Sequence, residues 1–190
     1  MMEMPNEKID KITVACNTGP LISAFQCGRI DLLKRYFKTI YIAPSQVAEF
    51  EKHGAAKELD DLTREGVVVL AEALTADEKE QAEMLARRIA AQPSSGDPDY
   101  HGHLPEAEVM IVAARPELGC VRILLDELAA RTVAEEEGLR ITGFPGVVGR
   151  AGLDGLLTRN DIRHVLSLCQ QQGTHYSDQL IEHVAETYGR

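Results

Sequence analysis

The chain has 190 residues, of which 44% are hydrophobic and 26% are charged. This length is enough for one domain with a full core, or for a domain of about 150 residues with an appendage. The formal net charge of −10 excludes a surface that coats nucleic acid, because broad phosphate binding draws on a basic stripe. It leaves room for a nuclease, since carboxylates around divalent metals add negative charge at a site.

No apolar run approaches the roughly 18 residues that a membrane helix needs. The first residues, MMEMPNEKIDK, are polar and lack the apolar centre of a secretory signal. We therefore expect a soluble, cytoplasmic protein without membrane contact. The four cysteines stand far apart, without zinc-type or redox-type pairing, which predicts reduced, structural thiols.

The chain begins its regular structure with a strand followed by a helix. Apolar and β-branched residues over 12–16 predict a buried strand, and the turn from Asn17 to Pro20 breaks it. Pro20 suits the first position of a helix that continues to about Gln26. Ligands of open α/β sheets bind outside the carboxyl ends of the strands, so Asn17 is the first candidate site residue.

Helices and strands then alternate through the first half of the chain. Helices are predicted over residues 30–37, from Pro44 onward, over 55–65 and over 75–92, and strands over 39–43 and 67–70. Thr75 and Glu78 form a capping-box pattern at the start of the longest helix. The segment from Pro93 to Leu104 has two prolines, two glycines and no apolar period, and it is predicted to be a loop.

The second half continues the α/β order and ends in two helices. Pro105 opens a helix, residues 121–125 form a strand that Asp126 ends, 127–137 are helical, and 140–142 form a short strand before a turn at 143–146. Two amphipathic segments, 160–172 and 177–188, predict a helical hairpin. We expect a domain over residues 1–151 with the hairpin, 152–190, packed on it.

Four acidic or amide side chains stand at the ends or starts of these elements. They are Asn17, Glu49, Glu108 and Asp126. Parallel topology can bring such positions together, and hard cations such as Mg²⁺ and Mn²⁺ require several oxygen ligands. The residues alone also allow local roles, because carboxylates often cap helices or lie in solvent.

The local alternatives differ from residue to residue. Asn17 equally suits bracing the turn through its amide. Glu106, in the first turn of its helix, favours the positive end of the helix dipole. Asp126 also fits a helix N-cap, and Glu127 is the reserve if the register is off by one. Glu51 is a solvated substitute for Glu49.

Three further groups are candidates for chemistry. Thr18 could hold a water or Asn17, although turn hydroxyls usually bond locally. Arg131 could meet a phosphate or pair with a neighbouring glutamate at helical spacing. The acidic and histidine residues between Asp97 and His103 lie in the predicted loop, which lacks the fixed geometry of a metal site.

The order of these motifs resembles one family. NTGPLI, from Asn17, is similar to the DTGPLI opening of PIN-domain nucleases, in the small prokaryotic branch that includes VapC-like toxins. SQVAEF around Glu49, EVMIVAA from Glu108 and ILLDELAAR around Asp126 resemble the later acidic motifs. RITGFPGVVGRA and the two hairpin segments resemble the rest, so the likeness spans roughly residues 11–189. Asn17 departs from the family, because it stands where the first metal-binding aspartate is expected.

The resemblance implies a three-layer α/β PIN-like domain with a parallel sheet of four or five strands. It implies metal-dependent hydrolysis of RNA phosphodiesters, with Asp126, Glu108 and Glu49 holding Mg²⁺ or Mn²⁺ beside Asn17. Thr18 and Arg131 are the candidates for contact with nucleic acid. A toxin-type relative further implies an antitoxin partner and a homodimer.

Two other functions remain open from the sequence. Asn17 removes a charge from the expected shell, which predicts weak Mg²⁺ binding and allows a PIN-like binding module with weakened or lost catalysis. An unrelated α/β protein that binds a small molecule is the other alternative, although TGP lacks the spacing of phosphate-binding glycine loops.

Overall fold

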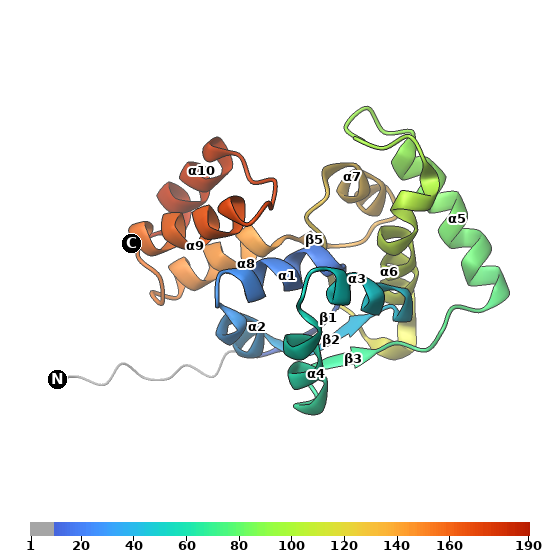
Figure 1. Cartoon of the computed structure of the whole chain (residues 1–190), viewed down its shortest axis with the longest axis horizontal. Coiled ribbons are helices and arrows are strands. Elements are labelled where there is room, and N and C mark those ends of the chain that lie inside the picture. Colours follow the sequence, from blue (N-terminus) through green and yellow to red (C-terminus); the bar gives the residue numbers. More distant parts are fainter. Residues whose placement is uncertain (1–9) are drawn as a thin grey trace.

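A parallel sheet forms the middle layer of the computed structural model, which describes residues 10–190 (Figure 1). Its strands are β1 (Ile12–Cys16), β2 (Phe37–Ile42), β3 (Val68–Leu70), β4 (Arg122–Leu124) and β5 (Ile141–Thr142). They lie in the order β3-β2-β1-β4-β5, and all neighbours are parallel. The prediction of an α/β fold with a parallel sheet of four or five strands is confirmed.

The strand order reverses beside β1, and this reversal positions the site. The chain moves from β1 outward to β2 and β3, then returns to place β4 on the other side of β1. Cys16 pairs with Leu124, and the backbone N–H of Asn17 donates to the Leu124 carbonyl at 2.9 Å. Such a switch point leaves a crevice at the carboxyl ends of the two strands.

Ten α-helices cover the two faces of the sheet within the described residues. They are α1 (Thr18–Gln26), α2 (Ile30–Tyr36), α3 (Val47–Lys52), α4 (Ala56–Arg64), α5 (Ala76–Ala90), α6 (Leu104–Ala114), α7 (Leu128–Glu136), α8 (Phe144–Leu153), α9 (Arg159–Gln171) and α10 (Asp178–Tyr188). Short 3₁₀ helices lie at Pro44–Gln46, Tyr100–His103 and Pro116–Leu118. Figure 1 shows α5, α6 and α7 on one side and the hairpin of α9 and α10 on the other.

The alternation of side chains along the strands divides the core in two. Cys16 and Leu124 point to a cluster with residues of α1, α2, α8, α9 and α10, whereas Ala15 and Ile123 point to a cluster with α5, α6 and α7. This is the expected result of a period of two in a sheet that is covered on both faces. Burial of both clusters fixes the register of β1 against β4.

Two elements differ from the sequence expectation. Residues 143–146, predicted as a turn, instead begin helix α8, which has Pro145 in its first turn and three glycines that weaken a helical pattern. A side chain at Gly149 or Gly152 would collide with Tyr188 of α10, so these glycines permit close packing of the two helices. The predicted loop from Pro93 to Leu104 contains the 3₁₀ helix Tyr100–His103.

The terminal hairpin shares the core of the sheet. Leu166 of α9 and Val184 of α10 belong to the same buried cluster as Leu21 of α1 and Phe144 of α8. Helix α8 runs across the boundary expected between residues 151 and 152, and the division into two units stays a prediction.

The four cysteines are free, as expected for structural thiols, with Cys16 and Cys169 buried. None of the helices in residues 10–190 is long and apolar enough to cross a membrane. Residues 1–9, which carry most of the segment tested for a secretory signal, lie outside the described residues.

The packing of α8 on α10 gives a first prediction. A Cβ at Gly152 would lie 2.6 Å from the Tyr188 carbonyl oxygen and 2.8 Å from Ile162 Cδ1. Gly152→Ala should therefore lower the free energy of unfolding by about 2 kcal/mol, despite the better helix propensity of alanine. Thermal unfolding measures the change. Gly96→Ala, at a glycine with no atom within 4 Å, is the control, and equal melting temperatures for the two variants would contradict the close contact.

Candidate functional site

A cleft of about 640 Å³ lies at the carboxyl ends of β1 and β4. Its walls include Asn17, Thr18, Glu49, Glu106, Asp126 and the segment 172–176 that joins α9 to α10. Three of the four predicted site residues, Asn17, Glu49 and Asp126, are therefore brought together. Glu108 is the fourth, and it does not line this cleft.

A chain of hydrogen bonds sets the orientation of Asn17. The backbone N–H of Ala43 donates to Gln46 Oε1 at 2.7 Å, so Gln46 must present its NH₂ group to the other side. Gln46 Nε2 donates to Asn17 Oδ1 at 2.7 Å, and Asn17 Nδ2 donates to Glu106 Oε1 at 2.9 Å. Because a backbone N–H can only donate, this order has one direction. Asn17 thus offers a donor, not an oxygen, to Glu106.

Glu106 is held at the start of α6, where Pro105 fixes the first turn. Its Oε1 accepts the Asn17 bond, while its Oε2 is buried without a partner among the described residues. Burial raises the pKa of Glu106, the Asn17 hydrogen bond opposes this rise, and the charge of Glu49 adds to it. Glu106 therefore has one buried carboxylate oxygen that accepts no hydrogen bond from residues 10–190.

The expected place of Glu108 is taken by Glu106. Two residues along an α-helix turn a side chain by about 200°, so the two glutamates of α6 face different ways. Glu108 accepts a hydrogen bond from Ser45 Oγ outside the cleft. The sequence assigned Glu106 to the helix dipole alone, whereas the fold directs it to Asn17.

Asp126 is held through both of its oxygens. Oδ1 accepts from the backbone N–H of Phe144 at 2.9 Å, and Oδ2 accepts from the Tyr176 hydroxyl at 2.7 Å. Burial raises the pKa of Asp126, and the two hydrogen bonds and the charge of Arg131 oppose this rise. A side chain at Gly143 would collide with Asp126 Oδ1, so the glycine is required for this close approach.

The N-cap of α7 is Glu127, whose carboxylate accepts from the backbone N–H groups of Ala129 and Ala130. Asp126 is therefore free of the capping role that its position also allowed. It is directed instead toward α8 and the α9–α10 connection. Glu127 also lines the cleft, but its oxygens are engaged by the helix.

The remaining candidates are placed less centrally. Glu49, with a side chain 41% exposed, lies 4.0 Å from His53 at helical spacing. Thr18 is buried, and its hydroxyl accepts from Gln46 Nε2 at 3.3 Å. Arg131 donates to the Leu125 carbonyl at 2.8 Å and does not line the cleft. Thr18 thus contacts the Gln46 amide that orients Asn17. Arg131 contacts the backbone immediately before Asp126.

The residues between Asp97 and His103 bond to one another. His103 is buried, and its Nε2 lies 2.9 Å from the Asp97 carbonyl and 3.0 Å from Ser95 Oγ. Asp99 Oδ1 lies 2.7 Å from His101 Nδ1. These contacts close the loop that precedes α6.

Three site residues were missed from the sequence. Gln46 has no signal of its own, because a glutamine after Pro44 and Ser45 is ordinary in a helix start. Glu106 was visible, but helical spacing from Glu108 could not say which of the two turns inward. Tyr176 lies 50 residues from Asp126, so only the tertiary structure could join them.

The comparisons with known proteins decide the family. A family model, DUF3368, described as a PIN domain, matches residues 13–190, which is nearly all of the chain. The chain belongs to the PIN-domain family. No curated protein and no solved structure gave a match.

Family membership gives a coarse function. PIN domains have a nuclease-type fold that binds nucleic acid, and they generally use divalent metals. The resemblance to PIN domains, which NTGPLI and the later acidic motifs carry, is confirmed, and so is the three-layer fold. The alternative of an unrelated α/β protein is wrong.

The donor set allows a test of the expected metal. Within residues 10–190, no three His, Cys, Asp or Glu side chains are grouped to hold an ion. Glu106 Oε2, however, is buried without a partner, and Glu49 and Asp126 line the same cleft. Mg²⁺ commonly binds through one or two carboxylates and completes its shell with water. The residues therefore fit one hard cation that completes its shell with water, and not a four-acid shell.

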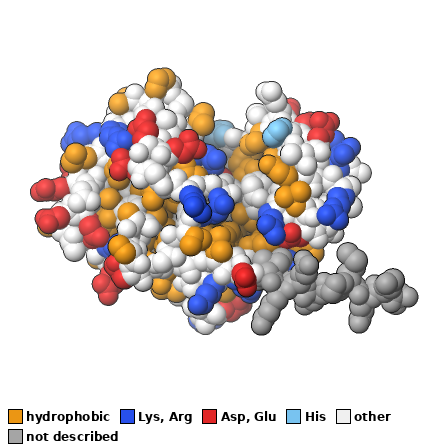
Figure 2. All heavy atoms as spheres, turned by 180° about the vertical axis from the view of Figure 1, so that it is seen from behind, with side chains coloured by type: hydrophobic (Ala, Val, Ile, Leu, Met, Phe, Trp, Pro, Cys, Tyr) orange, Lys and Arg blue, Asp and Glu red, His pale blue; other side chains and the backbone are white. Residues whose placement is uncertain are grey.

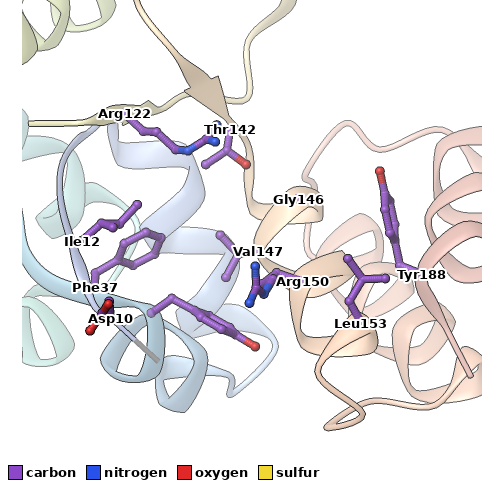
Figure 3. Close-up of a pocket in the computed structure, with 11 residues that line it drawn as sticks. Asp10, Ile12, Phe37, Arg122, Thr142, Gly146, Val147, Arg150, Leu153 and Tyr188 are labelled. Carbon is purple, nitrogen blue, oxygen red and sulfur yellow. The ribbon is translucent and has the colours of Figure 1, made fainter. Parts of the chain in front are cut away.

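A second hollow, of about 690 Å³, lies at the amino ends of the strands (Figure 3). Ile12, Phe37 and Arg122, the first residues of β1, β2 and β4 in this region, line it together with Arg150 and Tyr188. Within the described residues, one acidic side chain, Asp10, lines this hollow, whereas several carboxylates line the cleft at the carboxyl ends. Of these two hollows, the cleft beside Asn17 is therefore the one with an acidic lining.

The surface agrees with local and not broad contact to nucleic acid. On the face seen in Figure 2, Lys and Arg side chains stand in separate groups between hydrophobic and acidic ones. With a net charge of −10, the chain has little basic surface to draw phosphates from a distance.

The amide chain gives a second prediction. Gln46→Glu places two acceptors opposite each other, because the Ala43 N–H holds one carboxylate oxygen and the other then faces Asn17 Oδ1. Asn17 must turn its amide, which leaves its oxygen against Glu106. We expect a loss of about 2 kcal/mol in the free energy of unfolding at pH 7. Chemical denaturation measures it. Gln81→Glu, on the exposed face of α5, is the control, and equal stability of both variants would rule out the directed chain.

Proposed function

We propose that this PIN-domain protein is a metal-dependent ribonuclease with low metal affinity. The substrate is RNA, as the likeness to the toxin branch implies, and the cation is Mg²⁺ or Mn²⁺. One observation carries the proposal: in a PIN domain, a buried carboxylate oxygen of Glu106 has no partner within residues 10–190 and lies in a cleft that also contains Glu49 and Asp126.

The roles of the chain's own residues follow from their contacts. Glu106 and Asp126 would hold the cation, with Glu49 at the more exposed rim of the same cleft. When bound, the cation supplies neutralisation of the phosphodiester charge and acidifies a nearby water. Asn17 orients Glu106 by its N–H bond, and Leu128, 63% exposed where it lines the cleft, offers an apolar contact to a base.

Low affinity follows from the position of Asn17. An aspartate there would add a charge and an oxygen, whereas the asparagine adds an N–H group directed at Glu106. The hydrogen bond also engages one of the two oxygens of Glu106. A hard cation therefore competes with an internal donor for the same carboxylate.

A second candidate function rests on the same hydrogen bond. If the Asn17 amide satisfies Glu106 in place of a cation, the domain is a nucleic-acid-binding module without catalysis. A toxin-type role would add an antitoxin and a homodimer as partners, and these rest on the resemblance alone.

The direct test is cleavage of labelled RNA by the purified chain. Single-stranded RNA, structured RNA and single-stranded DNA are incubated with Mn²⁺ or with EDTA. We expect slow cleavage of RNA in Mn²⁺, none in EDTA, and none by Glu106→Gln, which keeps the acceptor for Asn17 but loses the charge. RNA that is bound and left intact in Mn²⁺ would support the second candidate. Cleavage that persists in EDTA would contradict the proposal.

Restoring the acid at position 17 gives a further prediction. Asn17→Asp places a carboxylate beside Glu106 Oε1, where the two charges repel unless a cation or a proton lies between them. The melting temperature should fall in EDTA and rise with Mn²⁺, and calorimetric titration should show Mn²⁺ affinity at least about tenfold above that of the wild type. Gln81→Glu, on the exposed face of α5, is the control, because it also adds one negative charge but lies outside the cleft lining. Equal Mn²⁺ affinities of Asn17→Asp and the wild type would mean that position 17 is not part of the shell.

A further inference from the structure

Tyr176 brings the C-terminal hairpin into contact with the site. It lies in the connection between α9 and α10, and its side chain is only 5% exposed. Its hydroxyl oxygen is 2.7 Å from Asp126 Oδ2 and 3.2 Å from Ser23 Oγ. The ring thus reaches from the hairpin, through the edge of α1, to the end of β4.

The hydrogen bonds at Tyr176 have a definite order. An ionised carboxylate accepts and cannot donate, so the single hydroxyl hydrogen of Tyr176 is directed at Asp126. Ser23 then donates to the Tyr176 oxygen. A phenol is protonated at neutral pH, so the Tyr176 hydroxyl has the hydrogen that this arrangement requires.

The connection that carries Tyr176 is itself anchored. Gln170 Nε2 donates to the Tyr176 carbonyl at 2.8 Å, and Thr174 donates to Gln26 Oε1 at 3.3 Å. The thiol of Cys169 donates to the Ser23 carbonyl at 3.4 Å. These bonds tie the end of α9 to α1, so the position of the hydroxyl is set by both elements.

Asp126 therefore has its carboxylate plane fixed from two sides. The Phe144 N–H, at the start of α8, holds Oδ1, and Tyr176 holds Oδ2. Each oxygen keeps a further lone pair. Hydrogen bonds of this kind orient the carboxylates that bind metals, and their removal typically weakens metal binding by about 10- to 100-fold.

We propose that Tyr176 is a positioning residue of the cleft, which holds Asp126 in the orientation needed to bind a divalent cation. The proposal rests on the proposed function, and it makes the helical hairpin part of the site. Its hydroxyl acts on Asp126 and touches neither the cation nor the RNA.

The chain contains a matched pair for comparison. The Tyr36 hydroxyl donates to Asp154 Oδ2 at 2.8 Å, and Tyr36 is 7% exposed. This tyrosine lines the hollow at the amino ends of the strands, away from the carboxyl-end cleft. Tyr36→Phe and Tyr176→Phe therefore remove the same kind of hydrogen bond at opposite ends of the sheet.

The test measures Mn²⁺ binding and thermal unfolding of the full chain. Mn²⁺ is titrated by calorimetry into the wild type, Tyr176→Phe and Tyr36→Phe, and into Asn17→Asp alone and combined with each of the two. We expect Tyr176→Phe to raise the Kd for Mn²⁺ about tenfold in both backgrounds, and Tyr36→Phe to change it less than about twofold. Both phenylalanine variants should lose similar stability.

The outcomes separate failure of the positioning role from failure of the proposed function. Mn²⁺ binding that Tyr176→Phe leaves unchanged, or that both phenylalanine variants weaken equally, would overturn the positioning role and leave the proposed function standing. Failure of every variant, Asn17→Asp included, to bind Mn²⁺ at millimolar concentration would overturn both. A selective loss in Tyr176→Phe supports both.

Discussion

The hydrogen bond from Asn17 Nδ2 to Glu106 Oε1 couples the two central elements of the cleft, the end of β1 and the start of α6. Its direction is set at a distance, by the backbone N–H of Ala43 acting through Gln46. Buried amides are restrictive in this way, because a reversed side chain would leave two acceptors or two donors in contact. The orientation of the site therefore depends on the donor-to-acceptor direction of hydrogen bonds that starts at the Ala43 N–H, just after β2.

The same interaction explains how the fold accommodates a buried carboxylate oxygen at this position. Two carboxylates in that position would repel, whereas an amide and a carboxylate attract. One oxygen of Glu106 accepts the hydrogen bond from Asn17, and the other has no partner within residues 10–190. The fold thus compensates half of this desolvated carboxylate with a donor of its own.

On the other side of the cleft, Asp126 is also a desolvated carboxylate that is held by hydrogen-bond donors of the fold. Asp126 is desolvated at the end of β4, and donors from α8 and from the α9–α10 connection compensate its charge. The close packing of α8 on α10, made possible by Gly149 and Gly152, brings those donors together. The hairpin is consequently linked to the chemistry of the cleft through Tyr176.

Much of the fold could be predicted because its signals are local. Alternating apolar residues marked the strands, the capping box at Thr75 marked α5, and a glycine or proline marked most ends. Helix α8 was missed because its three glycines lower helix propensity, and two of them, Gly149 and Gly152, serve a contact with Tyr188 that lies far along the chain. Local propensity cannot register a need that arises from packing.

The sequence by itself determined the family, the order of the elements, and the presence of Asn17 in the place of an expected acid. Tertiary structure decided which glutamate of α6 faces Asn17, because two positions on one helix differ by a rotation that only packing fixes. It also decided which way the Asn17 amide points and which residue holds Asp126. Those answers depend on Gln46 and Tyr176, which reach the cleft from separate segments of the chain.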